Sequence, residues 1–109
     1  MTFNQDLADR LRAILGELGP FTEKKMFGGL CFLKDGKMVF AANHTGDLMV
    51  RVEAARAEEY LERGAQRAMM GKGNPMSPNW LVVPVESVAD PEELRYWTGV
   101  ALAFHATLS

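Results

Sequence analysis

The residue types that carry out chemistry in proteins are sparse in this chain and poorly spaced for it. His44 and His105 stand far apart and outside the H-E-x-x-H pattern of metalloproteases. Gly28-Gly29 and Gly71-Lys72-Gly73 lack the order and spacing of phosphate-binding loops. No serine lies in a G-x-S-x-G elbow, and the carboxylates are spread along the sequence. We therefore expect no catalytic, metal-binding or cofactor-binding residues, and a protein that is not an enzyme.

The single cysteine bears on both redox chemistry and location. Cys31 excludes an intrachain disulfide and a thiolate metal cluster within one chain, which suits a reducing cytoplasm. It alternates with Leu30 and Phe32 in an apolar run, so we expect a packed thiol with a raised pKa. The N-terminus lacks the pattern of a signal peptide, and no window approaches the ~20 apolar residues of a membrane span. We expect a cytoplasmic protein that does not enter the membrane.

Length and charge favour one globular domain that does not bind nucleic acid directly. The chain has 109 residues, of which 48% are hydrophobic, and this is enough for one core over residues 1–109. The 12 basic and 14 acidic residues give a net charge of −2, which provides no general attraction to phosphate backbones. Short basic groups such as Lys24-Lys25 are explained by ordinary surface charge.

Amphipathic helices are predicted at both ends of the chain. Leucines recur at helical spacing over residues 3–18, and Thr2 with Gln5 has the form of a capping box. Near the C-terminus, Asp90-Pro91 provides an N-cap and a proline at the first helical position. This predicts a final helix over residues 91–107.

Between these helices the sequence changes to short apolar runs separated by turn residues. The runs at 26–33, 38–42 and 48–52 predict a three-stranded meander. Asp35-Gly36 joins the first two runs and suits the positive φ angles of a type I′ hairpin. In the third run apolar residues alternate with others, which predicts a sheet with helices on one side only.

The remainder of the chain completes the element order. A short helix is predicted over residues 54–63, and two more short strands flank the long Gly71–Asn79 loop. The expected order is therefore α-β-β-β-α-β-β-α.

The last helix is apolar around more than one stripe. One stripe, which contains Trp97 and Phe104, is enough to cover the core. The other apolar residues are either buried as well or meet a partner, since aromatic residues are enriched at interfaces. The candidate interaction surface consists of Tyr96, Val100 and Ala103.

A second candidate site is a pocket for a small molecule or peptide. The Gly71–Asn79 loop would act as its lid. Soft apolar side chains suited to an adaptable pocket flank this loop. They are Met70, Met76 and Trp80.

A set of motifs gives the chain a family resemblance. The run Lys24-Lys25-Met26-Phe27-Gly28-Gly29 is followed by the Asp35-Gly36 hairpin, by Asp47-Leu48-Met49-Val50-Arg51-Val52, and by Pro75-Met76 before Trp80-Leu81-Val82-Val83. Each piece is weak alone, but together they closely resemble the N-terminal domain of the TfoX (Sxy) competence regulators over nearly the whole sequence. The resemblance implies a two-layer α+β fold, in which helices cover one face of a five-stranded antiparallel sheet. This fold is similar to that of secretion-chaperone-like domains, which often pair as homodimers.

The resemblance also implies a non-catalytic role. Competence regulators of this family act with a transcription factor, the cyclic-AMP receptor protein, and typically carry a second, C-terminal domain. We expect a stand-alone N-terminal domain that binds a protein partner in transcriptional regulation; the alternative is the loop pocket described above. The family motif residues Lys25, Met26, Phe27, Gly28 and Gly29 are interpreted as structural, because the glycines let a strand bend or accept close packing.

Overall fold

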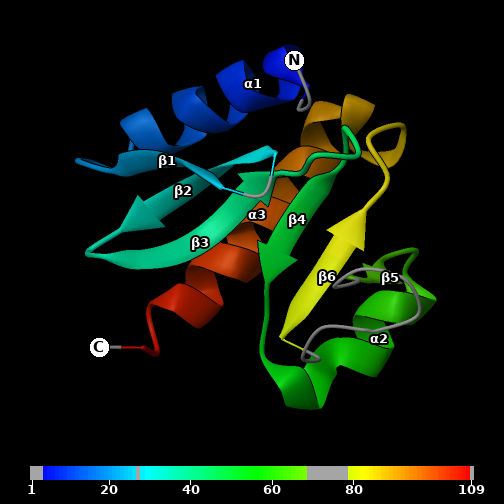
Figure 1. Cartoon of the computed structure of the whole chain (residues 1–109). Coiled ribbons are helices and arrows are strands. Elements are labelled where there is room, and N and C mark those ends of the chain that lie inside the picture. Colours follow the sequence, from blue (N-terminus) through cyan, green and yellow to red (C-terminus); the bar gives the residue numbers. More distant parts are fainter. Residues whose placement is uncertain (1–3, 27, 69–78, 109) are drawn as a thin grey trace.

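The fold is a two-layer α+β arrangement with one antiparallel sheet. The computed structural model describes residues 4–26, 28–68 and 79–108, and these form a six-stranded sheet in the order β1-β2-β3-β4-β6-β5 (Figure 1). The strands are β1 (Thr22–Met26), β2 (Gly29–Lys34), β3 (Lys37–Ala42), β4 (Leu48–Arg51), β5 (Gln66–Arg67) and β6 (Trp80–Val83). The helices are α1 (Gln5–Gly16), α2 (Ala57–Glu62) and α3 (Pro91–His105), with short 3₁₀ turns η1 (Ala54–Arg56) and η2 (Ser87–Ala89).

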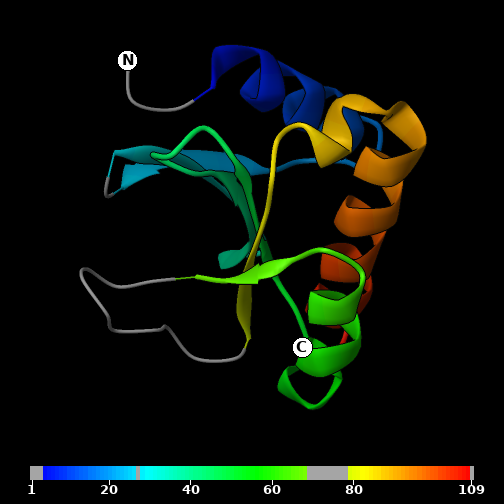
Figure 2. The same ribbon diagram turned by 90° about the vertical axis from the view of Figure 1, so that its right-hand side faces the viewer.

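The helices lie on one side of the sheet, as the alternation of apolar residues predicted. Figure 2 shows α3 along one face, with α1 near one of its ends and α2 near the other. One set of alternating strand residues, including Phe32, Phe40 and Val50, packs with the apolar residues of α1 and α3 in a single buried core. Among the described helices, none combines the length and apolarity needed to cross a membrane.

The N-terminal helix is shorter than predicted and begins at a different cap. Its N-cap is Asn4, whose side-chain oxygen accepts a hydrogen bond from the N–H of Leu7 at 3.1 Å. Asn is a strong N-cap because its short side chain satisfies an N–H that has no partner within the helix. The capping box expected from Thr2 and Gln5 is therefore wrong in position, since an N-cap at Asn4 makes Gln5 the first helical residue and not the third; Thr2 lies outside the described residues.

The apolar run at 26–33 was predicted as one strand, and this prediction is wrong. The run contains the turn between β1 and β2, at which Gly28 has a φ of 79°. The segment before this turn was missed because β1 is mostly charged, as is common for edge strands. Arg12 of α1 holds β1 by donating to both carboxylate oxygens of Glu23, at 2.5 and 2.8 Å. The extra strand makes the sheet six-stranded and not five-stranded.

The other turns and boundaries follow the predictions closely. Asp35 and Gly36 have φ angles of 55° and 78°, as a type I′ hairpin requires, so this prediction is confirmed. The helix predicted over 54–63 divides into η1 and α2. Asp90 caps α3 by accepting from the N–H of Glu92 at 2.9 Å, and α3 ends at His105.

Gly29 lets two strands approach closely. A Cβ atom at this position would lie 2.7 Å from the carbonyl oxygen of Ala42 and 3.3 Å from the backbone nitrogen of His44. Both neighbours are backbone atoms, which cannot rotate away as a flexible side chain can. The structural interpretation of this motif glycine is consistent with the contact.

Gly29→Ala should therefore destabilise the protein by about 1–3 kcal/mol, because the added methyl group forces the backbone to shift. Urea unfolding measures the change. Gly16→Ala is the matched control, since a Cβ there meets nothing within 4 Å at the end of α1. Helix propensity predicts that the control is unchanged or more stable by up to about 1 kcal/mol. Equal stability of the two variants would contradict the close approach at Gly29.

Candidate protein-interaction groove

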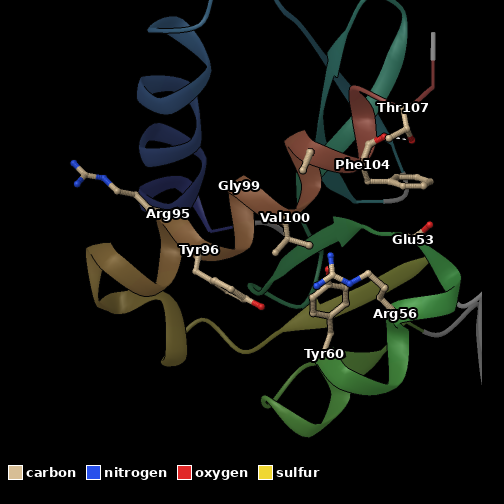
Figure 3. Close-up of a pocket in the computed structure, with 10 residues that line it drawn as sticks. Glu53, Arg56, Tyr60, Arg95, Tyr96, Gly99, Val100, Phe104 and Thr107 are labelled. Atoms are coloured by element: carbon tan, nitrogen blue, oxygen red, sulfur yellow. Dashed lines mark hydrogen bonds between the residues drawn. The ribbon is translucent and has the colours of Figure 1, made fainter.

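A groove of about 530 Å³ lies between α3 and the η1–α2 segment (Figure 3). Its size is in the range of sites that hold a few side chains of a partner or a small ligand. Residues of α3 form one wall, and residues from Glu53 to Tyr60 form the other. The lining residues are Glu53, Arg56, Tyr60, Arg95, Tyr96, Gly99, Val100, Ala103, Phe104 and Thr107.

The α3 wall contains the whole candidate interaction surface. Tyr96, Val100 and Ala103 recur at helical spacing and share one face of α3, next to the buried stripe of Trp97 and Ala101. Tyr96 and Val100 are partly buried, whereas Ala103 is exposed. The structure thus brings the three predicted residues together on one side of the groove. Whether a partner binds there stays a prediction.

Phe104 differs from its predicted role. The sequence assigned it to the core stripe with Trp97, but its ring is partly exposed and lines the groove. The helix turns by about 100° per residue, so Phe104 lies at the border of the buried stripe. The apolar surface of the groove is therefore larger than the predicted one.

The opposite wall is held by aromatic packing and a local ion pair. Tyr60 is 2% exposed, and its ring meets the Trp97 ring edge-on, with centroids 5.8 Å apart. The Arg56 guanidinium lies 5.3 Å from the Tyr60 centroid and donates to both carboxylate oxygens of Glu59 at 3.0 Å. These hydrogen bonds raise the pKa of Arg56 and lower that of Glu59. Both charged groups are exposed, so the pair orders the wall more than it stabilises the fold.

A second arginine connects the end of α2 to α3. Arg63, just after α2, lies 3.6 Å from the centroid of the Tyr96 ring on α3 and 3.3 Å from a carboxylate oxygen of Glu93. Tyr96 also packs edge-on against Trp97 at 5.1 Å. A guanidinium that stacks on a ring and pairs with a carboxylate fixes two side chains at once. The Tyr96 side of the groove is therefore ordered before any partner binds.

Arg51 is a candidate functional residue that the sequence did not single out. Its guanidinium lies 5.5 Å from the Trp80 centroid and 5.8 Å from the Phe104 centroid. Its Nε atom is buried and has no hydrogen-bond partner. In the sequence Arg51 is one of the residues that alternate with the apolar residues of its strand, and no local pattern places it beside Trp80 or Phe104. The signal was absent because Arg51 and Trp80 become cross-strand partners only through the β4–β6 register.

The predicted loop pocket cannot be assembled from the described part of the chain. Met70, Met76 and the Gly71–Asn79 loop, except for Asn79, lie outside the described residues. Trp80 is described, and it is partly buried beside Arg51. The loop pocket stays a prediction.

The family motif is not part of the groove. Gly28 lies in the β1–β2 turn, Gly29 at the start of β2 makes the close contact described above, and Lys25 is an exposed residue that pairs with Leu30 across the hairpin. Phe27 and the side chain of Met26 lie outside the described residues. None of the described motif residues lines the groove.

The remaining chemistry-bearing residues lie apart from one another. Cys31 is 4% exposed, and burial raises the pKa of its thiol, which confirms the packed role. His44 is in an exposed turn, whereas His105 Nε2 lies 2.6 Å from the carbonyl oxygen of Lys34. Among residues 4–26, 28–68 and 79–108, no three His, Cys, Asp or Glu side chains are grouped to hold a metal ion.

The burial of Tyr60 should make the stability of the folded protein fall at high pH. Desolvation raises the pKa of this phenol, while the Arg56 charge opposes the shift. The unfolded chain then releases the proton first, so the contribution of neutral Tyr60 is present below about pH 10 and is lost as the pH rises further. We expect the parent to lose stability more steeply above pH 10 than Tyr60→Phe, as followed by urea unfolding. Parallel curves for the two proteins would contradict this.

Comparison with known proteins places the chain in a family. A search of curated proteins gave no match. The sequence profile of the TfoX N-terminal domain, however, matches residues 13–105, which is most of the chain and spans the sheet and the whole of α3. The motifs, the α+β fold and this match agree, and the chain belongs to the TfoX N-terminal domain family.

Proposed function

We propose that this chain is a protein-interaction domain and not an enzyme, and that it binds its partner in the groove between α2 and α3. The observation that carries the proposal is the apolar stripe of Tyr96, Val100 and Ala103 along one wall of that groove. A helix that presents a second apolar stripe beside its buried one is typical of binding surfaces.

The composition and order of the groove support this proposal. Two tyrosines, one phenylalanine and two arginines line it, and these residue types are enriched where proteins meet. The contacts of Arg63 with Tyr96 and Glu93, and of Tyr60 with Trp97, hold the walls in place. A preformed site loses little side-chain entropy on binding, so more of the contact energy appears as affinity.

The partner class follows from the family and from the charge. Membership in the TfoX N-terminal domain family supports a role in competence-type transcriptional regulation in the cytoplasm. The net charge of −2 disfavours direct contact with DNA, so we propose that a transcription factor is the partner. The same apolar stripe on α3 is also suited to pairing with a second copy of the chain.

Ala103→Glu should abolish partner binding at low cost to stability, because Ala103 is exposed and a carboxylate there places charge in the apolar groove. Ala13→Glu is the matched control, since Ala13 is also an exposed alanine within a helix but does not line the groove. We expect a photo-crosslinking residue at position 103, and not at position 13, to attach to a transcription factor in living cells. Adducts at 103 with the same chain alone would support a homodimer instead, and no adduct would overturn the proposal.

A further inference from the structure

Three arginines in and beside the groove stack on aromatic rings, and two of them have a carboxylate partner within the fold. Arg56 pairs with Glu59, and Arg63 pairs with Glu93. Arg51 differs from both. Within the described part of the chain, no carboxylate lies at ion-pair distance from Arg51, and its buried Nε has no acceptor.

The surroundings of Arg51 make this difference costly. The Nε atom of Arg51 is buried, and the Trp80 and Phe104 rings near the guanidinium provide only part of the stabilisation that water or an anion would. A buried donor without an acceptor loses its hydration and receives no hydrogen bond in return. Such local costs concentrate at binding sites, where the ligand completes what the fold leaves open.

The position of Arg51 connects it to the groove. Phe104 both lines the groove and lies beside the Arg51 guanidinium. Glu53, two residues further along the chain, lines the groove as well. Arg51 is partly exposed, so solvent reaches part of its side chain. A segment that packs on Phe104 would therefore have a guanidinium within reach at its edge.

We propose that Arg51, which lies beside the rings of Trp80 and Phe104, binds a carboxylate of the protein segment that lies in the groove. This inference rests on the proposed function and adds to it that the partner carries an Asp, a Glu or a chain-terminal carboxylate next to its apolar residues. The planar guanidinium fork matches a carboxylate, and the two neighbouring rings restrict the positions that the fork can take.

The charges around the site favour a carboxylate over a phosphate. Arg56, a groove arginine that follows β4 in the chain, is already paired with Glu59. Glu53 adds a negative charge two residues from Arg51. One uncompensated guanidinium beside an acid suits a single negative charge, whereas phosphate sites usually gather several donors.

The first test is a titration of the whole chain with sodium acetate at constant ionic strength, with chloride as the reference salt. NMR signals of the arginine Nε–Hε groups and of the Trp80 indole N–H report on the site directly. We expect a saturable shift at Arg51 and Trp80 and none at Arg56 or Arg63, whose carboxylates are in place. No saturable shift at Arg51, or equal shifts at all three arginines, would overturn the inference. A stronger response to inorganic phosphate than to acetate would overturn the choice of a carboxylate.

Two variants distinguish a binding role of Arg51 from a structural role. Arg51→Met keeps the length of the side chain and removes the charge, so it should abolish the acetate response while its unfolding midpoint stays equal to or above that of the parent. Arg63→Met is the matched control, because it removes a stacked arginine that has its own carboxylate; it should lower the midpoint and keep the response. A large loss of stability in Arg51→Met, together with a parent that does not respond to acetate, would show that Arg51 is structural.

The inference and the proposed function can fail separately. If Ala103→Glu loses the partner but Arg51→Met retains full affinity, the groove binds a protein without the carboxylate contact. If Arg51→Met loses the acetate response and Ala103→Glu keeps its partner, Arg51 binds anions but the groove is not the interaction site; the carboxylate of a docked segment would then be excluded.

Discussion

The burial of Trp97 is the interaction on which both the fold and the groove depend. Its side chain is 1% exposed within α3, and it packs with the apolar residues of the sheet. It also meets Tyr60 and Tyr96 edge-on, one on each wall of the groove. Losing a buried tryptophan typically costs roughly 3–5 kcal/mol. The same residue therefore attaches α3 to the sheet and sets the position of the tyrosines at the surface.

Local patterns in the sequence predicted the fold well, and contacts between distant segments account for what was missed. Helical spacing located both terminal helices, the Asp90 cap located the start of the last one, and Asp35-Gly36 located a hairpin, because these signals act over a few residues. The β1 strand was missed because its residues are mostly charged and Gly28 was interpreted as part of a strand. The turn there depends on the positive φ angle of Gly28, and the number of apolar residues in a run does not indicate such an angle.

Only one wall of the candidate site could be predicted from the sequence. Helical periodicity determines which residues of α3 share a face, so Tyr96, Val100 and Ala103 could be grouped from sequence alone. The facing wall could not be predicted from the sequence, because the position of Tyr60 depends on how α2 packs against Trp97. Arg51 was hidden for the same reason: its neighbours Trp80 and Phe104 come from separate segments, and no local pattern joins them.

A binding site assembled from separate segments is also linked to the stability of the whole fold. Arg51, Trp80 and Phe104 belong to β4, β6 and α3, and they meet only when β4 pairs with β6 and α3 covers the sheet. A ligand held there binds the folded chain and not the unfolded one, so it raises the free energy of unfolding. This increase grows with the logarithm of the ligand concentration once the ligand exceeds its dissociation constant. Occupancy would thus tie together the N-terminal meander and the C-terminal half of the sheet, and a cell with abundant partner would contain a more durable protein.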